Sequence, residues 1–165
     1  MQPKIILVTG SVATGKTTTA KEISRKTNCE YININELIKK NKIYDNYNRK
    51  LDSYEVKINK LNTFLIKLIK KNRNGLVLDS HLSHYIDSKY ADLCVVCKCD
   101  IKMLKKRLEI RGYSEEKIRE NLDSEIFDVC LVEALEKKHK VIIVDTTENK
   151  LNYNIKIIIE RIKEI

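Results

Sequence analysis

The stretch that decides the fold is Gly10-Ser11-Val12-Ala13-Thr14-Gly15-Lys16-Thr17, which matches the pattern G-x-x-x-x-G-K-[ST] at every fixed position. The apolar run Ile5–Thr9 precedes it, and a stretch of helical period begins at Thr17. A strand, a glycine-containing loop and a helix in this order aim backbone N–H groups and a helix N-terminus at phosphate oxygens. A glycine turn with a chance lysine is the alternative, and the correct flanks disfavour it. The stretch therefore predicts a phosphate loop.

Apolar runs of strand length alternate with longer stretches of helical period, which predicts an α/β fold with a parallel sheet. We expect strands at Ile5–Thr9, Tyr31–Ile34, Leu76–Leu78, Leu93–Cys97 and Val141–Val144. We expect helices at Thr17–Lys26, Ile58–Lys71, Ile101–Ile110, Ser114–Lys137 and Asn152–Ile165. Most of the strand runs are continuously apolar, so helices should cover both faces of the sheet. The prediction is a three-layer α/β/α P-loop NTPase fold with a five-stranded parallel sheet, in one domain over residues 1–165.

The composition is that of a globular protein, with 42% hydrophobic and 33% charged residues. No apolar run approaches the roughly 20 residues of a membrane helix, and the first residues lack the pattern of a secretory signal. We therefore expect an intracellular protein without a membrane partner. The formal net charge of +9 comes mostly from scattered lysines, which suits a solvated surface or a polyanion such as RNA, without indicating sequence-specific DNA binding.

The cysteines allow a zinc interpretation, which the sequence disfavours. Cys94, Cys97 and Cys99 are close together, but they lie in a stretch that resembles a buried strand. Cys94 and Cys97 would then point to opposite faces of the sheet. No further Cys/His pair completes a tetrahedral site. We expect these residues to be small members of the core.

A second candidate site, which contains an acidic residue, follows the third predicted strand. Leu76-Val77-Leu78-Asp79 is a short apolar stretch ending in a carboxylate, which is the pattern of a strand that holds magnesium beside a phosphate loop. Two residues later, His81 could orient or deprotonate a water next to the γ-phosphate. The alternatives are a turn cap for Asp79 and a surface imidazole for His81. We expect a structural role for His84.

Two arginines lie at the end of the predicted helix Ile101–Ile110. Arg107 and Arg111 stand four residues apart and share a helix face, so both could present guanidinium forks to phosphate oxygens. Gly112 follows as a hinge, and Ser114 suits the N-cap of the next helix. This arrangement predicts a short lid, with an ordinary pair of surface arginines as the alternative.

Over nearly its whole length the chain resembles the adenylate kinase isoenzyme 6 family of archaea and eukaryotic nuclei. The residues that carry the resemblance are the phosphate loop, Tyr31-Ile32-Asn33, Tyr44-Asp45, Leu51-Asp52-Ser53-Tyr54, Asp79-Ser80-His81-Leu82-Ser83-His84, Arg107-Leu108, Arg111-Gly112-Tyr113 and Glu125-Ile126-Phe127-Asp128-Val129. The Asp-x-His after the third strand is the most specific of these. The chain departs from the family at Ala13, where glycine is common. It also departs at Lys39 and Lys40, where typical monophosphate kinases use arginine.

The resemblance implies a site for ATP and Mg²⁺, a monophosphate-binding segment at about residues 33–56 and a lid at about 110–120. It implies ATP contacts at Ala13, Gly15, Lys16, Thr17, Thr18 and Arg111, and together with the loop motif the predicted nucleotide contacts include Gly10 and Thr14. The predicted magnesium ligands are Thr17 and Asp79. The residues predicted to act in catalysis are Lys16, Asp79, His81, Arg107 and Arg111.

Three functional hypotheses follow. The first is a nucleoside monophosphate kinase that transfers the γ-phosphate of ATP to AMP or a similar nucleotide. The second is an ATPase that times assembly of the small ribosomal subunit by transient contact with a platform ribosomal protein and the pre-ribosomal particle. The resemblance suggests that both hold, in the cytoplasm of an archaeon or the nucleus of a eukaryote. The third is a P-loop kinase of another small metabolite.

Overall fold

The computed structural model describes residues 4–51 and 53–165, and its centre is a five-stranded parallel sheet. The strands are β1 (Ile5–Thr9), β2 (Glu30–Asn33), β5 (Leu76–Asp79), β6 (Leu93–Lys98) and β7 (Val141–Asp145). They lie in the order β2-β5-β1-β6-β7, and every neighbouring pair is parallel. The predicted P-loop type of α/β fold is thereby confirmed.

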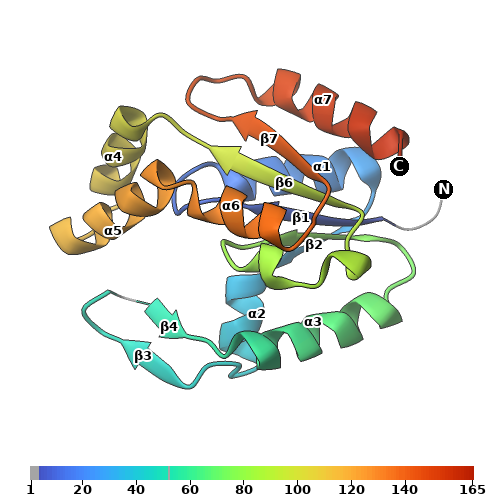
Figure 1. The fold of residues 1–165 in the computed structure, drawn as a ribbon, viewed down its shortest axis with the longest axis horizontal. Coiled ribbons are helices and arrows are strands. Elements are labelled where there is room, and N and C mark those ends of the chain that lie inside the picture. The colour runs from blue at the N-terminus through green and yellow to red at the C-terminus, as the bar shows by residue number, and fades with distance from the viewer. Residues whose placement is uncertain (1–3, 52) are drawn as a thin grey trace.

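Helices cover both faces of this sheet (Figure 1). The α-helices are α1 (Lys16–Thr27), α2 (Ile34–Lys40), α3 (Ile58–Lys71), α4 (Ile101–Ile110), α5 (Glu115–Ile126), α6 (Val129–Glu136) and α7 (Leu151–Lys163). Two 3₁₀ helices, Ser83–Tyr85 and Ser88–Tyr90, follow β5. One face packs against α1 and α7, and the other packs against α2, α3 and α6.

The continuous apolar strands divide their side chains between the two layers. In β1, Ile6 and Val8 belong to the α1–α7 layer, whereas Leu7 belongs to the opposite one. Cys94 and Cys97 of β6 also lie in opposite layers, as expected from the alternation along a strand. All five cysteines are buried free thiols. Within the described part of the chain, no group of three or more His, Cys, Asp or Glu residues could hold a metal ion.

The prediction of one helix over Ser114–Lys137 was wrong. The helix ends at Ile126, and α6 begins at Val129 after a change of direction. The break lies at Asp128, whose backbone is left-handed with φ 52°, a conformation that aspartate tolerates better than most residues. Lys98 forms an ion pair with the Asp128 carboxylate at this bend.

A second deviation lies between the second and third helices. Strands β3 (Asn46–Asn48) and β4 (Ser53–Glu55) pair as an antiparallel hairpin inside the predicted monophosphate-binding segment, for which no strands were predicted. Tyr54 packs its ring against Tyr44 and Tyr47, with ring centroids 4.5 Å and 5.1 Å away. At the other end of this segment, Ile34 is the first residue of α2 and not the last of β2, because the Asn33 side chain caps the helix by accepting the Glu36 N–H.

The hairpin and the α4–α5 pair flank the same edge of the sheet, where β1, β5 and β6 have their carboxyl ends (Figure 1). In parallel α/β sheets ligands bind at this edge. No helix among the described residues is long and apolar enough to cross a membrane.

Candidate active site

The phosphate loop runs from the end of β1 to the start of α1. Gly10 has φ 138°, and a Cβ at that position would lie 2.3 Å from the backbone oxygen of Cys97, so only glycine fits there. Gly15 caps α1 with φ 81°. Ala13 adopts a left-handed φ of 66°, which explains why glycine is favourable at this position in the resembling family.

Lys16 is folded back onto its own loop. Its Nζ donates to the backbone oxygen of Ser11 at 2.7 Å. Burial lowers the pKa of Lys16, while the charge of Asp79 opposes that shift. Because a neutral carbonyl is a weaker partner for an ammonium group than an anionic phosphate oxygen, a bound phosphate can take its place.

Asp79 ends β5 and is 2% exposed. Its Oδ2 accepts hydrogen bonds from Thr17 Oγ1 at 2.6 Å and from the Tyr31 hydroxyl at 2.9 Å. Burial and the neighbouring Asp79 charge raise the pKa of Tyr31 to about 12, so the phenol keeps its proton and remains a donor. Tyr31 therefore fixes the orientation of the carboxylate.

The pair of Thr17 and Asp79 suits magnesium. It offers one hydroxyl and one carboxylate, the hard oxygen donors that Mg²⁺ uses with phosphates and water in nucleotide sites. Both side chains line the cavity beside the phosphate loop, so a metal ion there would contact bound phosphates. These residues fit the predicted cofactor MgATP.

His81 lines the same cavity, and its side chain is exposed there. Desolvation by the surrounding protein, together with the positive charge of Lys16, lowers the pKa of His81 to about 4. The imidazole is therefore neutral near pH 7 and can accept a proton from water. His84 has the expected structural position, since its ring nitrogens lie 2.7 Å from Thr9 Oγ1 and 2.8 Å from Glu133 Oε2.

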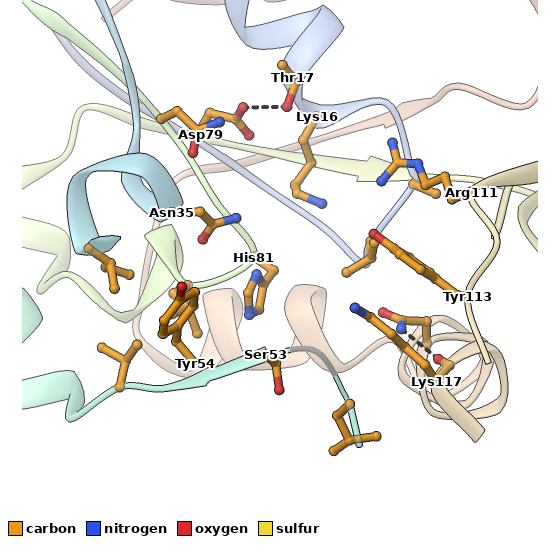
Figure 2. Close-up of a pocket in the computed structure, with 18 of the residues that line it drawn as sticks. Lys16, Thr17, Asn35, Ser53, Tyr54, Asp79, His81, Arg111, Tyr113 and Lys117 are labelled. Carbon is orange, nitrogen blue, oxygen red and sulfur yellow. Dashed lines mark hydrogen bonds between the residues drawn. The ribbon is translucent and has the colours of Figure 1, made fainter. Parts of the chain in front are cut away.

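The cavity has a volume of about 560 Å³ and joins three parts of the chain (Figure 2). The phosphate loop contributes one wall through Val12, Ala13, Gly15, Lys16, Thr17 and Thr18. Asn33, Asn35, Ile38, Lys39, Tyr47, Leu51, Ser53, Tyr54 and Val56 form the wall that comes from the predicted monophosphate segment. Asp52, which the resemblance included, lies outside the described residues. Gly10 and Thr14 shape the loop from behind and do not line the cavity.

The third wall comes from the predicted lid. Arg111, Tyr113 and Lys117 line the cavity and point into it from the α4–α5 connection and from α5 (Figure 2). An ion pair of 2.8 Å between Lys50 Nζ and Glu116 Oε1 joins the β3–β4 turn to the first turn of α5. The lid segment and the hairpin thus touch across the cavity.

The structure does not bring Arg107 into the cavity. Its guanidinium donates to the backbone oxygen of Thr146 at 2.6 Å and, at 3.4 Å, to that of Ala13. It thereby ties the phosphate loop to the segment after β7. The spacing of four positions predicted that Arg107 and Arg111 share one helix face. However, Arg111 is the residue after the end of α4, and its side chain lines the cavity.

Sequence reasoning missed several residues of the site. Tyr31 was quoted for the resemblance, but its hydrogen bond to Asp79, 48 positions away, was not predicted. Asn35 lines the cavity and accepts a hydrogen bond from Ser80 Oγ at 3.1 Å, and it was predicted only as a member of the segment 33–56. The residues Ser53 and Tyr54 were quoted only for the resemblance.

The parallel sheet, the phosphate loop and the acidic residue at the end of β5 define a P-loop nucleotide-binding protein. Residues 6–128 match the protein family described as AAA domain. The chain is 37% identical over 158 residues to a protein of Methanocaldococcus jannaschii named "Putative adenylate kinase", covering 96% of this chain and 85% of that protein. A protein of Pyrococcus furiosus with the same name is 40% identical over 143 residues, covering 87% and 75%. The chain therefore belongs to this family of archaeal adenylate kinase homologues.

Solved structures agree on the fold. Shikimate kinase from Acinetobacter baumannii, in complex with shikimate, matches with a TM-score of 0.68 at 12% identity, covering 99% of this chain and 94% of the other. The YorR protein of Bacillus subtilis, in complex with phosphorylated GDP, matches with a TM-score of 0.63 at 17% identity, covering 97% and 96%. At these identities the likeness concerns the architecture alone.

Proposed function

We propose that the protein transfers the γ-phosphate of MgATP to a nucleoside monophosphate, with AMP as the first acceptor to test. The observation that carries this proposal is the shared cavity, because the phosphate loop and the 33–56 segment line the same space from opposite sides. Its volume of about 560 Å³ lies within the range of about 300–1,000 Å³ typical of small-molecule sites. The names of the archaeal relatives support the same activity.

Catalysis rests on positioning and on charge. Lys16 and Arg111 place two positive charges at the cavity wall where the transferring phosphate would lie, and they stabilise the negative charge that spreads over its oxygens. Thr17 and Asp79 would hold the magnesium ion, which neutralises phosphate charge when it is bound. No covalent intermediate on the protein is required, because a monophosphate in the same cavity can accept the phosphate directly.

The acceptor phosphate would meet Lys39, which lines the cavity where typical monophosphate kinases have an arginine. A lysine binds phosphate as a point charge and does not impose the two-pronged geometry of a guanidinium. We therefore expect acceptor binding that is weaker and less selective than with arginine, which agrees with a broad monophosphate specificity.

A second activity, hydrolysis of ATP without an acceptor, is favoured by His81. A neutral imidazole on the cavity wall is suited to take a proton from water beside the γ-phosphate. We propose that this hydrolysis assists late maturation of the small ribosomal subunit, as the resemblance to the isoenzyme 6 family implies. Retention of the protein on small-subunit precursor particles in the presence of an ATP analogue, and release on hydrolysis, is the expected behaviour. A protein that never co-sediments with such particles contradicts that role and leaves the kinase proposal standing.

The test of the main proposal is ADP formation from ATP and Mg²⁺, measured with and without AMP. A rise on adding AMP, with two ADP formed per ATP consumed, is the expected result. Lys16→Ala should abolish turnover, whereas Lys26→Ala, on the exposed last turn of the same helix, should leave it unchanged. A slow rate that ignores AMP would shift the function to hydrolysis. A response to another small hydroxyl compound in its place would identify a kinase of a different metabolite.

A further inference from the structure

A buried carboxylate contacts the phosphate loop from behind, and no role has been assigned to it so far. Glu125, in the last turn of α5, is 6% exposed. Its Oε2 accepts the Ser11 hydroxyl at 2.9 Å, and its Oε1 accepts the Cys99 N–H at 2.9 Å. The side chain thus bridges the two loops that follow the neighbouring strands β1 and β6.

The position of Glu125 on its helix is unusual for a carboxylate. Ile118, Leu122 and Glu125 are spaced i, i+4 and i+7 and share the buried face of α5. A carboxylate on such a face is costly unless polar groups satisfy it by hydrogen bonds. Ser11 and Cys99 supply these bonds here, so the carboxylate has a specific partner in the phosphate loop.

Ser11 is the point through which the loop holds its shape. Its backbone oxygen accepts Lys16 Nζ at 2.7 Å and Thr14 Oγ1 at 2.7 Å. The residue itself is 4% exposed, so it has little freedom once its hydroxyl is bound. A group that fixes Ser11 therefore fixes the resting place of the Lys16 ammonium as well.

The same helix also reaches the cavity. Lys117, Glu120 and Asn121 of α5 line the cavity, one to two turns before Glu125. Apolar packing joins the two parts further, because Ala13 of the phosphate loop belongs to one cluster with Ile118. Loop and lid helix are thus in contact through one polar and one apolar connection.

We propose that Glu125 is a positioning residue that holds Ser11, and with it the phosphate loop, in register with the lid helix α5. It touches no substrate. It acts through Ser11 on the loop that receives the ATP phosphates, and through α5 on the side chains that enter the cavity. The part of this inference that concerns ATP rests on the proposed function, whereas the connection between Glu125 and the loop does not.

The test is a double-mutant cycle with Ser11→Ala, Glu125→Gln and both together. Asp123→Asn is the matched control, since it makes the same carboxylate-to-amide change at an exposed position of the same helix. Amide hydrogen exchange of residues 10–15 is measured without ligand. We expect each single variant to accelerate this exchange about fivefold and the double variant to do no more, because both remove one connection. The control should stay within twofold of the wild type.

The second readout is the affinity for a non-hydrolysable ATP analogue with Mg²⁺, and for AMP. Each single variant should weaken analogue binding about tenfold, without further loss in the double variant, while the affinity for AMP changes less than twofold. Melting temperatures identify a variant that fails to fold, and in that case Ser11→Ala alone still gives both readouts. Wild-type exchange in Glu125→Gln, or strictly additive effects, would overturn the inference. If the wild type fails to bind the analogue, the proposed function fails, and the exchange cycle still decides the role of Glu125.

Discussion

Thr17 Oγ1 lies 2.6 Å from Asp79 Oδ2, so the first turn of α1 and the end of β5 meet at one oxygen pair beside the phosphate loop. The Tyr31 hydroxyl donates to the same Oδ2 from the neighbouring strand β2. The carboxylate therefore has its orientation fixed before any ligand binds, and this arrangement leads to a first prediction.

Tyr31→Phe should weaken the response to magnesium and spare nucleotide binding. Loss of one hydrogen bond frees the Asp79 carboxylate to rotate, and we expect the Mg²⁺ concentration for half-maximal activity to rise about fivefold. Binding of ATP in the presence of EDTA should be unchanged. Initial rates over a Mg²⁺ series check the first expectation, and calorimetry of ATP binding in EDTA checks the second. Tyr153→Phe is the control, since the Tyr153 side chain is 65% exposed. An unchanged Mg²⁺ response would show that Thr17 alone orients the carboxylate.

Lys39→Ala should raise the KM for AMP about tenfold, equivalent to about 1.4 kcal/mol, while the KM for ATP changes less than twofold. Lys39 lines the cavity on the side of the hairpin, with its Nζ 5.4 Å from the centre of the Tyr54 ring. Lys40, the next residue, is exposed and does not line the cavity, so Lys40→Ala is the matched control. Equal effects of the two substitutions would point to the general positive field and not to a contact. Initial rates over an AMP series separate these outcomes.

His81→Ala should lower AMP-independent hydrolysis by at least tenfold and leave AMP-dependent transfer within about threefold, because only hydrolysis needs a base for water. The pKa of His81 is lowered to about 4, so the imidazole stays neutral above pH 5. The kcat/KM for hydrolysis reports ionisations of the free enzyme. Protonation of His81 should therefore leave kcat/KM unchanged between pH 8 and pH 5 and lower it below about pH 4. Bound ATP adds negative charge and should move the inflection in kcat to higher pH than that in kcat/KM. A parallel loss of both activities in His81→Ala would contradict a role specific to water.

His84 should make the fold sensitive to acid. Burial lowers the pKa of His84, despite the opposing influence of Glu133, so the folded state binds fewer protons than an unfolded chain with a histidine pKa of about 6.5. Its contribution to stability is complete above about pH 6.5 and is lost as the pH falls through the folded-state pKa. The slope for one proton is at most about 1.4 kcal/mol per pH unit. Urea unfolding at pH 7.5, 6.5 and 5.5 should show a steeper loss for the wild type than for His84→Gln. Since His81 is present in both proteins, parallel curves would exclude His84 as the source.

Much of the fold follows from short-range pattern. The sheet could be predicted from the continuously apolar strands and from the fixed positions of the phosphate loop. Both patterns are visible among residues that are close together in the sequence. The break in the helix after Ile126 was missed, since it depends on a left-handed Asp128 held by Lys98. Hydrophobic periodicity does not predict a left-handed backbone conformation at a residue other than glycine.

The site was predicted less evenly. Lys16, Thr17, Asp79, His81 and Arg111 line the cavity as a motif-based search indicates. Arg107 has the right chemistry and spacing, yet carbonyl groups of Ala13 and Thr146 hold its guanidinium, a competition that sequence cannot reveal. Glu125 did leave a signal, namely a carboxylate on an otherwise apolar helix face, but its partner Ser11 lies 114 positions away.

The ion pair between Lys50 and Glu116 has a consequence for the speed of nucleotide capture. It joins the hairpin to α5, and both side chains are well exposed, at 75% and 48%. Water screens both charges, so an exposed pair of this kind adds little to the stability of the contact. Release of this pair should therefore not limit nucleotide capture, and we expect association to be set by diffusion and orientation.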